Sequence, residues 1–226
     1  ETDENPPDLS DKTWTRISFL EMEQDDEVKW LFLKRGCMHC TEAACVEVCP
    51  TNALKHHANG MVTVERDLCN GCGYCTQFCP FGIPRLGGVD AITGEAKSSK
   101  CTFCQDRTTN GLSPACAQVC PTGAIEFGDR AELIAEGKQR VEALKAKGRT
   151  DARLYGEKEL GGLHQMYVMD EKASIYGLPE SPSYPAGASI KSIVKPVGHL
   201  AIGAALVGSI AAFFISRRNI HMEEVE

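Results

Sequence analysis

The sequence predicts an α+β protein built from small repeated units and followed by one membrane-crossing helix. Three observations lead to this prediction. The 226-residue chain contains 12 cysteines, which all fall into three quartets. The segments that leave two of the quartets repeat one another, because Cys-Pro-Thr-Asn-Ala-Leu at 49–54 resembles Cys-Pro-Thr-Gly-Ala-Ile at 120–125. Near the C-terminus, an apolar stretch at 197–215 approaches the length of about 20 residues that spans a bilayer.

The middle quartet carries the most specific pattern. Residues 69–80 read Cys-Asn-Gly-Cys-Gly-Tyr-Cys-Thr-Gln-Phe-Cys-Pro, and this C-x2-C-x2-C-x3-C-P spacing is typical of bacterial ferredoxins that hold [4Fe-4S] clusters. Gly71 and Gly73 allow tight turns between the thiolates and leave amide groups free to face cluster sulfurs. In two-cluster ferredoxins the fourth cysteine binds the other cluster, so the pattern predicts a partner quartet.

That partner lies upstream. Residues 1–35 form an acidic lead followed by two predicted strands, at 13–21 and 27–34, which suggest a hairpin. The first quartet then has the spacing C-x2-C-x4-C-x3-C-P. Exchange of the fourth cysteines predicts two complete clusters. Their ligands would be Cys37, Cys40, Cys45 and Cys79 for one cluster, and Cys49, Cys69, Cys72 and Cys75 for the other.

The third quartet follows a loop of glycine and small residues that ends at Lys100. It consists of Cys101, Cys104, Cys116 and Cys120, and its C-x2-C-x11-C-x3-C spacing alone is also compatible with zinc. Its exit matches that of the first quartet, which favours iron-sulfur. Exchange needs pairs of quartets, so this one either holds a third cluster alone or shares with a quartet that once preceded Glu1. Because the first residue is not methionine, we expect the second arrangement.

Residues 36–128 are therefore predicted to form a domain of ferredoxin-like repeats. Residues 129–176 would add an amphipathic helix, capped by Asp129, and a short extension. The helix would pack on the cluster domain through Leu133, Ile134, Val141 and Leu144. Residues 177–192, rich in proline, would form a linker, residues 193–216 a transmembrane helix, and residues 217–226 a tail. Small residues four apart in this helix predict packing against another membrane subunit.

Composition and motifs exclude several classes of function. A net charge of −7 argues against nucleic acid as a partner. Disulfide bonding of the cysteines is disfavoured, because each quartet has metal-type spacing. We see no nucleophile-base pair, phosphate loop or paired carboxylates, so no catalytic residue is predicted. Several clusters without a substrate site indicate an electron-transfer protein, and a zinc-stabilised membrane scaffold is the alternative from another class.

Eight segments carry a resemblance to a known family: 36–40, 70–75, 79–86, 100–104, 114–116, 120–128, 161–168 and 176–179. With the C-terminal helix, they resemble the iron-sulfur (beta) subunits of membrane-bound molybdenum or tungsten oxidoreductases, and most of all those of respiratory formate dehydrogenase. The family has four [4Fe-4S] clusters and an additional N-terminal quartet of the plain ferredoxin type. This chain departs from the pattern, since no cysteine precedes Cys37.

The resemblance also implies partners and a location. We expect a catalytic alpha subunit with molybdopterin or tungstopterin, a cytochrome b gamma subunit that passes electrons to quinone, and a place in the bacterial cytoplasmic membrane. The cluster domain would be periplasmic and the tail, after Arg217 and Arg218, cytoplasmic. The same role in a sulfur-compound, sulfoxide or nitrate reductase complex is the alternative within this class.

Overall fold

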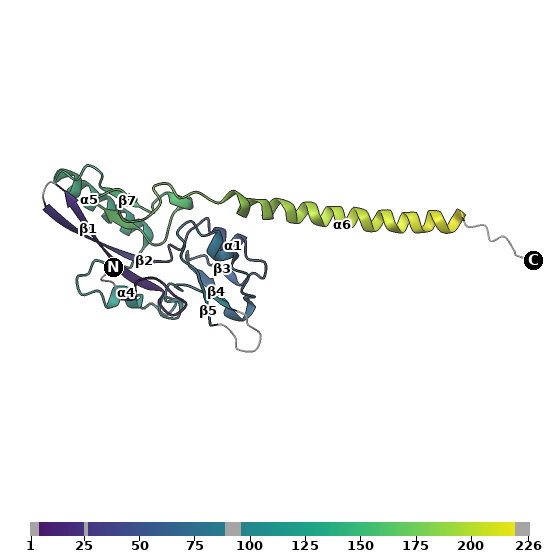
Figure 1. Ribbon diagram of the computed structural model, residues 1–226, viewed down its shortest axis with the longest axis horizontal. Helices are drawn as coiled ribbons and strands as arrows, with labels where there is room; N and C mark the ends of the chain where they lie inside the picture. Colours follow the sequence, from purple (N-terminus) through teal and green to yellow (C-terminus); the bar gives the residue numbers. More distant parts are fainter. Residues whose placement is uncertain (1–4, 25–26, 89–95, 220–226) are drawn as a thin grey trace, which may run out of the picture. The chain divides into compact units, whose positions relative to one another are not determined.

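The computed structural model describes residues 5–24, 27–88 and 96–219. The chain divides into two compact units, Glu1–Pro185 and Ala186–Glu226. Figure 1 shows the first as a set of small hairpins and short helices, and the second as one long helix. In the described part of the chain, each sheet is a two-stranded antiparallel ladder: β1 with β2, β3 with β4, β5 with β6, and β7 with β8.

The first hairpin joins β1 (Thr15–Gln24) to β2 (Glu27–Gly36). Its period-two pattern buries Leu31 and Leu33 and leaves Trp30 and Phe32 exposed on the opposite face. This confirms the predicted hairpin, with strands that run two or three residues further than expected.

Two short helices form the centre of the cysteine-rich region. The first helix, α1 (Ala44–Glu47), precedes the hairpin of β3 (Leu54–His56) and β4 (Val62–Val64), and a 3-10 turn at Arg66–Leu68 leads on to α2 (Tyr74–Gln77). The two helices pack against each other. Each contains the third cysteine of its quartet and ends before the fourth, so the loops before both helices are brought side by side.

The segment before the third quartet is more ordered than the sequence indicates. In place of a simple loop, β5 (Arg85–Gly87) pairs with β6 (Lys97–Ser99). Ser98, Ser99 and Lys100 are all buried. Because these residues are polar, a hydrophobicity pattern does not reveal the strand. Their burial depends on hydrogen-bond partners that only tertiary contacts provide.

The third quartet is followed by the longest helix of the first unit. After α3 (Gln105–Thr108) and α4 (Ala115–Gln118), α5 runs over Arg130–Ala146. The Asp129 carboxylate caps α5, as predicted, by accepting from the backbone N–H groups of residues 131 and 132 at 2.8 and 3.3 Å.

The inner face of α5 packs on the strands β7 (Arg153–Tyr155) and β8 (Tyr167–Met169). Val141 is buried, whereas the other three predicted contact residues, Leu133, Ile134 and Leu144, are half-buried. The helix begins directly after Asp129, as predicted, and ends at Ala146. Its contact with β7 and β8, which belong to the C-terminal extension, differs from the expected packing on the cluster domain.

The extension also builds the main core. Tyr155 and Leu163 are completely buried there, together with Leu31 and Leu33 of the hairpin and Met38 of the first quartet loop. A 3-10 turn at Glu159–Gly161 leads into this contact. Segments more than 100 residues apart in the sequence therefore enclose the loop that carries Cys37 and Cys40.

The predicted linker at 177–192 differs from the structure. Tyr176 and Leu178 are buried in the core, and helix α6 begins within the range, over Ala186–Asn219. Within the described residues, Leu200–Arg217 is the one stretch of helix long and apolar enough to cross a membrane, by length and composition.

Candidate metal centres

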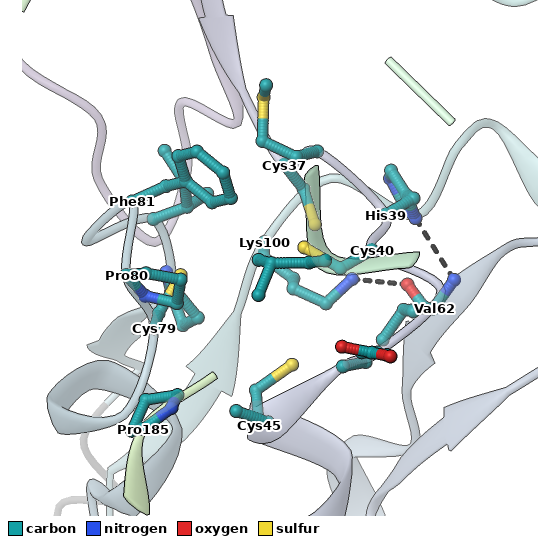
Figure 2. Close-up of a pocket in the computed structure, with 17 residues that line it drawn as sticks. Cys37, His39, Cys40, Cys45, Val62, Cys79, Pro80, Phe81, Lys100 and Pro185 are labelled. Carbon is teal, nitrogen blue, oxygen red and sulfur yellow. Dashed lines mark hydrogen bonds between the residues drawn. The ribbon is translucent and has the colours of Figure 1, made fainter. Parts of the chain in front are cut away.

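The twelve cysteines all lie within the described residues and form no disulfide bonds, and eight of them line two hollows. The first hollow is lined by one set, shown in Figure 2: Cys37, Cys40, Cys45 and Cys79. The second hollow is lined by the other set: Cys49, Cys69, Cys72 and Cys75. These are the two sets that exchange of the fourth cysteines predicts. Ligation itself stays a prediction at this point.

The exchange follows from the two short helices. Cys45 lies in α1 and lines the first hollow, whereas Cys49, four residues on, lines the second. In the reverse direction, α2 carries Cys75 to the second hollow and leads to Cys79 at the first. Four residues of helix rise about 6 Å. The two hollows are therefore close neighbours.

The thiols are too widely spread for one small ion. Four thiolates on a zinc ion lie roughly 4 Å from one another, since each Zn–S bond is about 2.3 Å long. Over residues 5–24, 27–88 and 96–219, no three Cys, His, Asp or Glu side chains converge closely enough to hold a single ion. Four soft thiol donors around a hollow fit an iron-sulfur cluster better.

The repeated Cys-Pro exits have a common local structure. Backbone N–H groups after the proline hydrogen-bond the sulfurs of Cys49, Cys79 and Cys120. Proline has no N–H, so these bonds start at the following residue. At two of the exits a threonine hydroxyl also lies beside the sulfur, 3.6 Å away at Thr51 and 3.4 Å away at Thr122. Such donors stabilise a thiolate, and they explain the sequence repeat.

Burial acts on the thiols of both hollows. In the second hollow, burial raises the pKa of Cys75, whereas Cys72 is exposed. In the first hollow, three thiols have raised pKa values. Burial, reinforced by the neighbouring Cys37, raises the pKa of Cys40 and Cys45 well above the usual thiol range. Burial also raises the pKa of Cys79, although N–H donors from its exit turn act in the opposite direction. Thiols with raised pKa values stay protonated until a metal replaces the proton.

Two histidines fix the loop of the first hollow. His39 is buried, and its Nδ1 accepts from the backbone N–H of Val62 at 3.0 Å, which leaves the ring proton on Nε2 (Figure 2). Burial, with help from Lys100, holds the pKa of His39 well below its usual range. Nε2 has no hydrogen-bond partner among the described residues.

The second histidine, His164, lies in the C-terminal extension. Its Nδ1 lies 2.7 Å from the His39 carbonyl, and its ring packs over Gly60. A Cβ at Gly60 would lie 1.9 Å from that ring, at a φ of +84°. This position therefore needs glycine.

Lys100 is the other buried polar residue of the first hollow. It is 3% exposed, and its ammonium donates to the carbonyls of Val62 and, at 3.0 Å, Cys101. In Figure 2 its side chain lies among the four labelled cysteines.

The second hollow is held by β6. The Ser98 N–H donates to the Cys69 sulfur at 3.3 Å, and its hydroxyl lies 3.3 Å from the Cys75 sulfur. Lys97 reaches the Cys69 carbonyl at 2.6 Å. Gly71, predicted to permit a tight turn, has a φ of +72°, and a Cβ there would lie 2.3 Å from the carbonyl oxygen of residue 96. Hence β6 packs directly on the quartet loop.

The third quartet is distributed differently. The two hollows include none of its cysteines in their linings. Cys101 packs beside Cys37 and Cys79, and burial raises its pKa. The Thr122 hydroxyl, with backbone donors, lowers the pKa of Cys120 to about 7. Cys104 precedes α3, and Cys116 lies in α4. The turn after Cys120 thus resembles the turn after Cys49, but Cys120 lines neither hollow.

Sequence reasoning did not assign roles to His39, Ser98, Lys100 or His164. The available signals were weak, since each is a single polar residue near a cysteine or glycine. Lys100 directly precedes Cys101, but only the fold shows that its side chain turns to the other quartet.

Comparison with known proteins agrees with this geometry. Residues 28–130 match the family model of the 4Fe-4S dicluster domain. The chain is 41% identical to the formate dehydrogenase iron-sulfur subunit of Haemophilus influenzae, over 99% of this chain and 71% of that protein. It is 42% identical to the iron-sulfur subunit of the nitrate-inducible formate dehydrogenase of Escherichia coli K12, over 92% of this chain and 70% of that protein. Identity falls to 32% for the hydrogenase-2 operon protein HybA of Escherichia coli O157:H7, over 80% of this chain and 62% of that protein.

Identity above 40% over nearly the whole chain, together with the dicluster match, is decisive. The chain belongs to the family of formate dehydrogenase iron-sulfur subunits, and it is a non-catalytic electron-transfer subunit.

Proposed function

We propose that this chain transfers electrons from a formate-oxidising catalytic subunit through [4Fe-4S] clusters in its two cysteine-lined hollows. The observation that carries the proposal is the exchange of cysteines through α1 and α2. It surrounds each hollow with four thiols and keeps the two hollows close together, because the exchanged cysteines are only four residues apart. Adjacent cluster sites suit successive one-electron transfers.

The ligands would be the two sets that line the hollows: Cys37, Cys40, Cys45 and Cys79, and Cys49, Cys69, Cys72 and Cys75. When bound, [4Fe-4S] clusters accept and release single electrons at potentials set by charge, hydrogen bonding and exposure. The chain's own residues supply these influences. The Cys-Pro exit turns donate N–H groups to the sulfurs, Ser98 donates to Cys69, and the main core shields the first hollow from water.

The third quartet would add at least one more cluster site. Cys101, Cys104, Cys116 and Cys120 have the ligand spacing, and the exit turn of Cys120 resembles that of Cys49. We propose that these four thiols contribute to a cluster beyond the two hollows.

The partners follow from the family. We propose a molybdopterin or tungstopterin catalytic subunit as electron donor and a membrane cytochrome b, leading to quinone, as acceptor. The names of two relatives state that they are iron-sulfur subunits of formate dehydrogenase, which supports a catalytic partner subunit. A different reductase complex is the alternative, but the lower identity to HybA favours formate.

The apolar helix α6 would anchor the chain in the cytoplasmic membrane. Leu200–Arg217 is of suitable length and composition, and Arg217 at its end favours a cytoplasmic tail. The cluster domain would then be periplasmic. Protease treatment of spheroplasts and of inverted vesicles tests this topology, and cleavage of the tail from the periplasmic side would refute it.

Anaerobic purification with iron and sulfide analysis tests the cluster proposal. Two clusters predict about eight irons per chain and three predict about twelve, with equal amounts of sulfide. Zinc without sulfide would refute the proposal. Reduction of the clusters by formate in the copurified complex, and its absence without the catalytic subunit, would identify the electron donor.

A further inference from the structure

The first hollow contains a positive charge that has no carboxylate partner. Lys100 is buried, and among the described residues no Asp or Glu forms an ion pair with it. An ammonium has three N–H donors, and the carbonyls of Val62 and Cys101 use two of them. A buried ammonium without an anion is unfavourable, because it has lost its hydration. Glu42, the carboxylate of the lining, is exposed, and no ion pair joins it to Lys100 among the described residues. The buried part of the site therefore favours a further negative group.

The surroundings of Lys100 point to the thiolates of the first hollow. Lys100 lines this hollow together with the four thiols, and Figure 2 shows its side chain among them. His39 is the other basic residue of the lining, and its Nδ1 accepts the Val62 N–H, which a neutral ring can do and a protonated ring cannot. Four thiolates and an iron-sulfur core would supply the missing negative charge.

The second hollow differs from the first in its charge. Among the residues that the structure describes, its lining contains neither lysine nor arginine. Lys97 contacts the Cys69 carbonyl from a half-buried position outside that lining. Cys72, on the second hollow, is exposed, so water can screen charge there, whereas the first hollow combines burial with a fixed cation.

We propose that Lys100 is a positioning residue that compensates the charge of the cluster in the first hollow and raises its reduction potential. The proposal rests on the proposed cluster site of Cys37, Cys40, Cys45 and Cys79. Reduction adds one electron, and thus one negative charge, with no bond made or broken at Lys100. A buried cation favours the more negative form, because a low dielectric strengthens the attraction.

The test is an anaerobic redox titration of the full chain in its complex, monitored by electron paramagnetic resonance. Lys100→Gln removes the charge but can still donate to the Val62 carbonyl, and Lys100→Arg keeps the charge. Lys138→Met is the matched control, since Lys138 is an exposed lysine paired with Glu157 on the surface. A Cys79→Ser variant, which lacks a ligand of the first site, identifies the signal of that cluster.

We expect Lys100→Gln to lower the potential of the first cluster by at least 59 mV, which is a tenfold change in the one-electron equilibrium constant. Lys100→Arg should move it much less, and Lys138→Met should not move it. An unchanged potential in Lys100→Gln, or an equal shift of both clusters, would overturn the proposal.

Assembly provides the second readout. If the first cluster forms in Lys100→Arg but not in Lys100→Gln, the charge is required and the proposal stands. If it forms in neither, Lys100 acts through its shape and the proposal fails. Iron analysis of the wild type separates these outcomes from a failure of the proposed function, which would show as fewer than about eight irons per chain.

Discussion

The two hollows have the same four-cysteine composition but very different surroundings. The first is enclosed by the main core and lined by the buried Lys100 and His39. The second is lined by more polar or exposed residues, with Cys72 open to solvent, and relies on Ser98 of β6 for hydrogen bonds. Potential depends on exposure, charge and hydrogen bonds to sulfur. We therefore expect two clusters with the same four-thiol ligation to have different potentials.

The comparison first requires that the two sites exchange their fourth cysteines. We expect Cys79→Ser to remove the cluster of the first hollow and Cys49→Ser to remove that of the second, each with a loss of about four irons. The paired controls Cys40→Ser and Cys72→Ser should remove the same respective clusters. Electron paramagnetic resonance spectra of the four variants provide the measurement. If Cys79→Ser and Cys72→Ser removed the same cluster signal, the result would contradict the exchange.

Support from the core should matter for the first hollow alone. Leu163 is completely buried and forms a β-bridge with Cys40, so Leu163→Ala should cost about 2–5 kcal/mol of unfolding free energy. Urea unfolding measures this cost, and the signal of the first cluster should disappear at a lower urea concentration than that of the second. Leu112→Ala, at an exposed position, serves as the control. Equal loss of both signals would argue against separate support.

Low pH should weaken the packing between the N-terminal hairpin and the C-terminal extension. Lys29 of β2 bridges Asp170 and Glu171 after β8, at 2.6 Å in each case. Burial alone would raise the pKa of Asp170, but hydrogen bonds from Lys29 and Tyr176 hold it below its usual value. A lowered folded-state pKa gives stability that is present above the unfolded value near 4 and is lost as the pH falls through the folded pKa.

We therefore expect Asp170→Asn to cost about 1 kcal/mol at pH 7 and less at pH 3, below the unfolded pKa. The difference in urea midpoint between the two apoproteins at these pH values measures the effect. The exposed pair of Lys55 and Glu65 gives the control, because Glu65→Gln should cost little at either pH. A cost for Asp170→Asn that is the same at both pH values would contradict the assignment.

The smallest effect concerns the second hollow. Ser98→Ala removes the hydroxyl beside the Cys75 sulfur, and loss of a donor should lower the potential of the second cluster by less than the change expected at Lys100. The Ser98 backbone N–H still reaches Cys69 in this variant. Redox titration should show no change in the first cluster, and a shift there would mean that the hollows are not independent. Thr150→Ala, at an exposed position after α5, is a suitable control.

Several elements could be predicted because their signals are local. The hairpin of β1 and β2 follows from alternating side chains, and α5 from its cap at Asp129. The β5–β6 hairpin could not be predicted, since Ser98 and Lys100 are polar and become buried only through contacts with two quartet loops. The linker prediction failed for a similar reason. Tyr176 and Leu178 lie in a proline-rich segment, yet they complete a core whose other side is the N-terminal hairpin.

Cysteine spacing by itself determined the type of site and the two four-cysteine sets that line the hollows. Spacing is sufficient there because short helices of four residues set which way each thiol faces. Tertiary structure alone decided how the two hollows differ. The contact between His39 and His164 joins residues 125 positions apart, and Lys100 turns from its own quartet to the first. Burial and charge arise from such distant contacts, and no local pattern records them.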